Sequence, residues 1–204
     1  MLSLITHRLE SLPIGRSMPI DDELGEAAIL LALTCEQDDP KIILTKRAEH
    51  LRSHAGEVAF PGGKWEPGDN DLLMTALRET HEEIDLPPES VEVIASLPVN
   101  QTRHSMRVSF YVGLVSPEQS FTANPDELDA VFRVPLRYFL DQSNLTVERF
   151  TGPDYSLRMP CYIYQGYRIW GFSLVVLINF LNLTLDAGIN LYYPDKSDLR
   201  PNID

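Results

Sequence analysis

Cysteine is scarce in this chain, which has only Cys35 and Cys161 among its 204 residues. They stand far apart, so they form neither a CxxC motif nor the paired framework of a disulfide-rich domain. We therefore interpret both as core thiols in a reducing compartment and expect a cytoplasmic protein. The first residues also lack the apolar stretch of a signal peptide, because His7, Arg8 and Glu10 interrupt it, and we expect no secretion.

Basic residues are also in short supply. The chain has 17 Lys and Arg against 30 Asp and Glu, for a formal net charge of -13. An acidic surface repels phosphate backbones, which argues against nucleic acid or an anionic membrane as a main partner. A phosphorylated small molecule remains compatible with this charge if metal ions or a local basic cluster offset the repulsion.

Long hydrophobic runs are absent except over residues 169–185. This run is barely long enough to cross about 30 Å of hydrocarbon. Asn179, Asn182 and Asp186 recur at helical spacing and place one polar stripe on it. We interpret the run as a C-terminal core helix and expect no membrane partner.

The remaining pattern predicts one α/β domain over residues 1–204, with an N-terminal extension over residues 1–24 that includes a short helix. Hydrophobic residues make up 44% of the chain, which is enough for a sizeable core. Strands are expected at residues 27–34, 41–45, 57–60, 91–97, 107–115, 131–134 and 160–164, and helices at residues 72–84 and 136–140. Strands interleaved with helices predict a mixed α/β sandwich.

The predicted helix over residues 72–84 carries a cluster of acids. Glu79, Glu82 and Glu83 fall within roughly 100° of arc on one flank of this helix. Like charges placed so close repel one another, and Arg78 offsets only one of them. Because an all-oxygen ligand set selects hard ions, we expect Mg²⁺ or Mn²⁺ to neutralise the others.

A glycine pair, Gly62-Gly63, precedes this helix at a short distance. Glycine lets the backbone approach a ligand closely where a side chain would prevent it. A solvated acidic helix face is the alternative interpretation of the glutamates alone. The glycine turn beside them favours a metal site that binds diphosphate.

Residues 63–86 resemble the signature of the Nudix family, which runs from a glycine through a spaced acid to an Arg-Glu pair and then a glutamate pair. Two positions depart from it. The gap from Gly63 to Arg78 is one residue longer than usual, so either Asp69 or Asn70 takes the first acidic position. Asp85 stands where the signature has glycine, which leaves the helix exit open.

The resemblance implies an α/β/α sandwich with a mixed β-sheet and metal-dependent hydrolysis of a diphosphate bond. Glu79 and Glu83 would ligate the essential metal, and Glu82 would share a second ion. We expect Glu79 and Glu82 to be catalytic. Glu127 is a candidate general base, although a plain surface acid explains it equally well.

A second block, over residues 44–63, resembles the coenzyme A pyrophosphatase branch of the Nudix family. It reads Leu44-Thr45-Lys46-Arg47-Ala48, then Arg52, His54, Gly56 and Phe60-Pro61-Gly62-Gly63. The resemblance implies cleavage of coenzyme A or an acyl-CoA to 3′,5′-ADP and 4′-phosphopantetheine or its acyl form. We expect substrate contacts from Arg47, Arg52, His54, Gly62 and Gly63.

The basic residues of this block suit such a ligand, because coenzyme A carries a diphosphate and a 3′-phosphate. Ion pairing with Glu49 and Glu57 is an equal explanation for Lys46 and His50. The rival activities are hydrolysis of ADP-ribose, NADH or another nucleoside diphosphate derivative, or binding of such a ligand without turnover. The oligomeric state is open, and a homodimer is compatible with the sequence.

Overall fold

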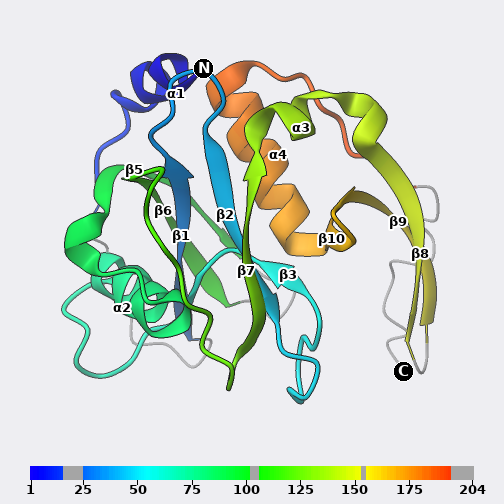
Figure 1. Cartoon of the computed structure of the whole chain (residues 1–204), viewed down its shortest axis with the longest axis horizontal. Coiled ribbons are helices and arrows are strands. Elements are labelled where there is room, and N and C mark those ends of the chain that lie inside the picture. The colour runs from blue at the N-terminus through cyan, green and yellow to red at the C-terminus, as the bar shows by residue number, and fades with distance from the viewer. Residues whose placement is uncertain (16–24, 102–105, 153–154, 194–204) are drawn as a thin grey trace. The chain divides into compact units, whose positions relative to one another are not determined.

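The computed structural model describes residues 1–15, 25–101, 106–152 and 155–193 (Figure 1). The chain forms two compact units, Met1–Leu136 and Arg137–Asp204. The single domain expected over the whole chain stays a prediction. Of the expected N-terminal extension, residues 16–24 lie outside the described part, and the short helix predicted before them is α1 (Leu2–Leu9).

The first unit is built on a seven-stranded sheet. Its strands are β1 (Glu26–Thr34), β2 (Lys41–Arg47), β3 (Val58–Ala59), β4 (Gly62–Lys64), β5 (Glu92–Gln101), β6 (Arg107–Val115) and β7 (Leu128–Pro135). The order is β3-β2-β1-β6-β5, with β4 paired to β1 and β7 paired to β2. Strands β1 and β6 are parallel and the other pairs are antiparallel, so the sheet is mixed, as predicted.

Strand β1 is the centre of the sheet, and its sequence EAAILLALT explains why. Every residue of this strand except Ile29 is buried. A strand covered on both faces reads as a continuous apolar run rather than an alternation. Strands β2, β4 and β6 each pair with β1, so this central strand sets their positions in the sheet.

Helix α2 (Leu72–Ile84), followed by the short helix η1 (Pro88–Ser90), covers one face of this sheet (Figure 1). Its buried residues Leu73, Ala76 and Ile84 join one core cluster with Ala28 and Tyr111 of the sheet. The bounds of the helix are as predicted.

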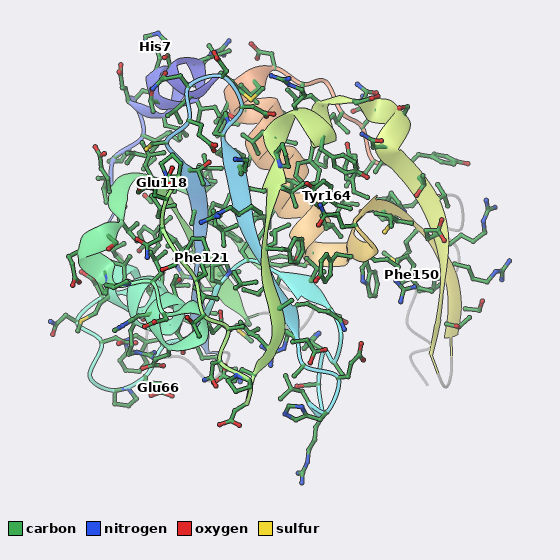
Figure 2. The ribbon with its side chains drawn as sticks, viewed as in Figure 1. His7, Glu66, Glu118, Phe121, Phe150 and Tyr164 are labelled. Carbon is green, nitrogen blue, oxygen red and sulfur yellow. The ribbon has the colours of Figure 1, made fainter. Side chains whose placement is uncertain are left out.

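The second unit starts within helix α3 (Leu136–Leu140). Its other elements are η2 (Gln142–Asn144), β8 (Leu145–Gly152), β9 (Tyr155–Tyr164), β10 (Tyr167–Trp170) and α4 (Gly171–Leu185). The strands form an antiparallel sheet in the order β10-β9-β8. Phe150 of β8, labelled in Figure 2, stacks on Trp170 with ring centroids 4.1 Å apart. Helix α4 is the predicted C-terminal core helix. Across the described ranges, no helix has both the length and the apolar character needed to span a membrane.

Candidate active site

The acidic helix α2 begins and ends through aspartates. The Asp71 side chain caps its first turn by accepting a hydrogen bond from the Met74 N–H at 2.8 Å. Asp85 ends the helix in the left-handed conformation, with φ 56° and ψ 39°, and its N–H donates to the His81 carbonyl. Glycine usually takes this position, and aspartate is among the few other residues that tolerate it. The departure from the signature at Asp85 therefore leaves the helix exit intact.

The glycine pair allows two close approaches. A Cβ on Gly62 would lie 2.3 Å from the Ala28 carbonyl oxygen, and the residue has a φ of +137°. A Cβ on Gly63 would lie 2.4 Å from the Glu79 carboxyl carbon. The sequence led us to expect these glycines to make room for a ligand. In the structure they make room first for strand β1 and for the Glu79 carboxylate.

Two of the three helical glutamates lie against this turn. Glu83 is only 4% exposed, and it accepts a hydrogen bond from the Gly62 N–H at 3.1 Å. The Glu79 side chain, 17% exposed, packs over Gly63. Glu82 differs, because its side chain is 55% exposed. The structure thus brings Glu79 and Glu83 together at the turn and leaves Glu82 nearer to solvent.

Burial and mutual repulsion set the protonation of these acids. Burial, together with the negative charges of Glu127 and Glu79, raises the pKa of Glu83 to about 8, although the hydrogen bond from the Gly62 N–H and the charge of Arg47 lower it. The pKa of Glu79 is also raised, mainly by burial, with contributions from Glu82 and Glu127. The negative charges of Glu79, Glu83 and Glu127 therefore repel one another within one region of the site.

Glu127 reaches this place from the end of the segment that precedes β7. Its carbonyl accepts the Ala48 N–H at 2.9 Å, and its own N–H donates to Asn124 at 3.1 Å. Asn124 in turn donates its N–H to the Glu83 carbonyl at 2.9 Å. These main-chain bonds tie the segment to both β2 and α2, and they explain why the Glu127 charge acts on the helical acids.

Arg78 organises the exposed side of the cluster. Its guanidinium contacts both oxygens of Asp69, at 2.9 and 3.0 Å. It also donates to the Lys64 carbonyl, to Glu79 at 3.1 Å and to Glu82 at 3.0 Å. One arginine thereby holds two helical glutamates and the strand β4.

Asp69 is the acid that completes this arrangement. It is 8% exposed and also accepts hydrogen bonds from the Thr75 hydroxyl at 2.9 Å and the Glu66 N–H at 3.3 Å. The Arg78 guanidinium holds the pKa of Asp69 below its usual value. The backbone of Asn70 instead donates to the Met74 sulfur. Of the two candidates for the first acidic position, Asp69 is the one that contacts Arg78. The sequence could not distinguish them, because the choice depends on the path of the loop.

The basic block is divided between a strand and a loop. Arg47, on β2, has its Nε buried without a hydrogen-bond partner, and its charge attracts the Glu83 carboxylate. Arg52 and His54 are exposed on the loop after β2, where His54 contacts Glu57 at 3.0 Å. Of the predicted substrate-binding side chains, Arg47 is the one whose charge acts on Glu83, whereas Arg52 and His54 are exposed.

The other two basic residues of the block have protein partners. Lys46 forms ion pairs with Glu49 at 2.8 Å and Asp129 at 2.9 Å, so the ion-pairing explanation applies to it. His50 hydrogen-bonds the Asp126 carbonyl at 3.2 Å. Both contacts fasten the block to the segment that carries Glu127.

The chemistry of this donor set suits a hard cation. Its oxygen ligands are carboxylates, and their burial and repulsion raise the pKa of two of them, a cost that bound positive charge would remove. Among the described residues, however, no three acidic, histidine or cysteine side chains are already arranged to hold a metal ion. The Arg78 contacts to Glu79 and Glu82 account for part of this, because they draw both carboxylates toward the guanidinium.

Comparison with known proteins places this site in a family. Residues 24–150 match the NUDIX domain. The chain is 38% identical over 155 residues to the "Uncharacterized Nudix hydrolase NudL" of Enterobacter sp. (strain 638), covering 74% of this chain and 79% of that protein. The protein of the same name from Salmonella newport (strain SL254) is 37% identical over 187 residues, or 91% of this chain and 95% of its own.

The fold agrees with a solved structure. A MutT/nudix family protein from Enterococcus faecalis superposes with a TM-score of 0.51 at 16% identity, covering 81% of this chain and 64% of that one. The chain therefore belongs to the Nudix family, and the predicted class, a Nudix hydrolase with an α/β fold, is confirmed.

Proposed function

We propose that this protein hydrolyses the diphosphate bond of coenzyme A or an acyl-CoA, releasing 3′,5′-ADP and 4′-phosphopantetheine or its acyl form. Arg47 carries the proposal. It belongs to the block that resembles the coenzyme A branch, its Nε–H is buried without a partner, and its charge lowers the pKa of Glu83. Such a donor suits an anionic oxygen, because guanidinium N–H groups bind phosphate strongly.

Nudix hydrolases generally use Mg²⁺ or Mn²⁺. Here Glu79 and Glu83 would hold the essential ion, and Glu82 would share a second one. A bound divalent ion supplies positive charge against the diphosphate and acidifies water. Arg78 and Asp69 act as positioning residues, because Arg78 donates to Glu79 and Asp69 holds the Arg78 guanidinium.

The residues of the chain then have separate tasks in the hydrolysis. Arg47 binds a diphosphate oxygen and offsets its charge. Glu127 accepts a proton from the attacking water, whose oxygen bonds to phosphorus as the bridging P–O bond breaks. Each product leaves as a phosphate monoester. The water supplies the oxygen of one monoester, so atoms and charge balance without a further reactant.

The test is a substrate panel in ¹⁸O-labelled water. Purified protein with Mg²⁺ or Mn²⁺ is incubated with coenzyme A, acetyl-CoA, ADP-ribose, NADH and ATP, and the products are identified by mass. We expect fastest turnover of coenzyme A or its acyl form, with the label in one of the two monoesters. Faster cleavage of ADP-ribose or NADH would assign another Nudix activity. Metal binding without cleavage of any compound would indicate a non-catalytic module.

A further inference from the structure

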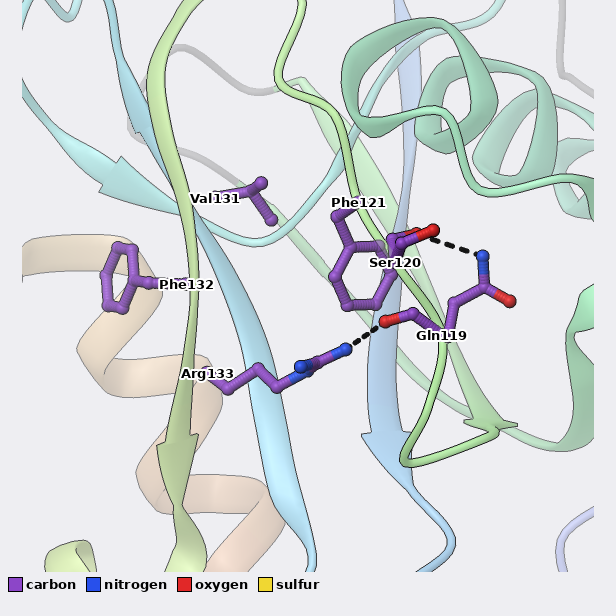
Figure 3. A pocket seen from close by; sticks show the side chains of 6 residues that line it. All are labelled: Gln119, Ser120, Phe121, Val131, Phe132 and Arg133. Carbon is purple, nitrogen blue, oxygen red and sulfur yellow. Dashed lines mark hydrogen bonds between the residues drawn. The ribbon is translucent and has the colours of Figure 1, made fainter.

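A pocket lies in the first unit between strand β7 and the segment that follows β6. Its volume is about 460 Å³, which is within the range of small-molecule sites. The residues that line it are Gln119, Ser120, Phe121, Val131, Phe132 and Arg133 (Figure 3). None of them belongs to the acidic site described above.

Arg133 is the charged group of this pocket. Its Nη2 donates to the Gln119 carbonyl, and its guanidinium lies over the Phe121 ring, 4.8 Å from the centroid (Figure 3). Its Nε is buried and has no hydrogen-bond partner. A buried N–H without a partner is costly, and arginine presents Nε–H and Nη–H as a fork that fits an oxyanion. The guanidinium is thus held in place by Gln119 and Phe121, while its Nε–H makes no hydrogen bond.

The charge of Arg133 is not neutralised by direct contact. Over the residues that the structure describes, no ion pair includes this arginine. Its charge helps to lower the pKa of Glu36, but the larger causes there are hydrogen bonds from Lys41 and Thr34. Glu36 already has those two partners. The Arg133 guanidinium is therefore available to bind another anion, even though the chain has a net charge of -13.

The strand register separates this pocket from the acidic site. Arg133 lies opposite Ile43 on β2, whereas Arg47 lies opposite Leu128. Four residues along a strand correspond to about 13 Å. Between the two places, the Asn124 N–H bonds to the Glu83 carbonyl and fixes the intervening segment to α2. An anion beside Arg133 would not occupy the acidic site.

We propose that this pocket binds a small organic oxyanion, a carboxylate or a phosphate monoester, on a flat apolar body. The Arg133 guanidinium donates to the oxyanion, and the Ser120 hydroxyl supplies a second donor at the pocket wall. Phe121 and Val131 contact the apolar body, and both pack on the main core, which keeps the wall rigid. The guanidinium and the ring together recognise charge and shape.

Calorimetric titration of the full chain tests this site. Benzoate and phenyl phosphate are the two probes, benzyl alcohol is the neutral control, and a chelator keeps divalent ions from drawing phenyl phosphate to the acids. We expect one probe or both to bind with one-to-one stoichiometry and benzyl alcohol to bind at least about tenfold more weakly. Binding of benzoate alone identifies a carboxylate ligand, and binding of phenyl phosphate alone identifies a phosphate monoester. Equal binding of benzyl alcohol, or no binding at millimolar concentration, would overturn the proposal.

Variants locate the binding. Arg133→Met should weaken it about tenfold or more, whereas Arg158→Met, at an exposed arginine of β9, and Arg47→Met should leave it unchanged. Loss in Arg47→Met with retention in Arg133→Met would place the anion at the acids and refute a separate pocket. If Arg133→Met does not fold, amide shifts in the wild-type protein decide. They must change at residues 119–121 and 131–133 on titration, and shifts confined to residues 79–83 would contradict the site.

Discussion

Arg78 of the acidic helix donates hydrogen bonds to both carboxylate oxygens of Asp69, at 2.9 and 3.0 Å. The pair joins the loop after β4 to the helix that carries Glu79 and Glu82. It explains how one additional residue in this loop is accommodated. The loop only has to place one acid against Arg78, whatever its length. The buried Asp69 is that acid.

The first prediction concerns this pair. Asp69→Ala should lower the free energy of unfolding by about 1–3 kcal/mol, because it leaves Arg78 partly buried without its main partner. Asn70→Ala, at the exposed neighbouring position, should change it by less than about 0.5 kcal/mol. Urea unfolding measures both variants. Equal effects at the two positions would show that Asp69 does not anchor the loop.

Gly62 and Gly63 should respond differently to alanine. Gly62→Ala forces a Cβ against the Ala28 backbone at a φ of +137°, so we expect a large loss of thermal stability. Gly68→Ala is the matched control, because its φ is +132° but nothing lies within 4 Å of its Cβ. The melting temperature of Gly62→Ala should fall well below that of Gly68→Ala. Similar values would mean that backbone strain alone, and not the contact with β1, requires Gly62.

Gly63→Ala should act on the site more than on the fold. The added Cβ meets the end of the flexible Glu79 side chain, which can move, whereas backbone cannot. We therefore expect a modest change in melting temperature and a clear loss of metal affinity and turnover. Calorimetric titration with Mn²⁺ measures the affinity. Retained affinity would show that Glu79 can ligate from a second position.

The part of this site that the sequence could predict is local. Helix 72–84 was predicted at its observed bounds, because an apolar period of 3.6, the Asp71 cap and Pro87 all indicate it. Strand β4 was not predicted, because a glycine pair has low strand propensity and its pairing depends on the close approach to Ala28. Strand β8 was also missed, since its polar sequence has no apolar run that would mark a strand.

The division of labour among the glutamates depended on tertiary structure. A helical wheel places Glu79, Glu82 and Glu83 on one flank but cannot say which of them the turn buries. The Gly62 N–H selects Glu83, and Arg78 draws Glu82 outward. Arg47 and Arg52 looked equivalent in the motif for the same reason, until one proved to lie on β2 and the other on an exposed loop.

Glu79→Gln should abolish hydrolysis while the protein stays folded. The substitution keeps the shape of the side chain but removes the charge that would hold a divalent ion. A loss of several kcal/mol in transition-state stabilisation corresponds to roughly a thousandfold in rate. Glu89→Gln, at an exposed acid of η1, is the control and should retain full activity. Circular dichroism checks the fold, and near-normal turnover in Glu79→Gln would refute the proposed role.

Stability without metal should depend on pH through Glu83. Its pKa in the folded protein, about 8, lies above the ordinary value of 4.5, so the folded state binds an extra proton between these values. The resulting stability is present at low pH and is lost as the pH rises toward and through 8. In chelator, the free energy of unfolding should therefore fall between about pH 5 and pH 8 and level off above pH 8. Glu83→Gln, which can still accept the Gly62 N–H, should flatten this dependence, and an unchanged slope would assign it to another group.

The two cysteines should differ sharply toward alkylation. Cys161 is buried in the second unit, and burial raises the pKa of its thiol to about 12, so almost none of it is thiolate at neutral pH. Cys35 is exposed after β1, so the expectation that both cysteines are core thiols is wrong for Cys35 and is confirmed only for Cys161. Because the thiolate is the nucleophile, iodoacetamide should modify Cys35 alone in the folded protein and both residues in urea. Peptide mass analysis at successive times gives the two rates. Comparable rates in the folded state would contradict the burial of Cys161.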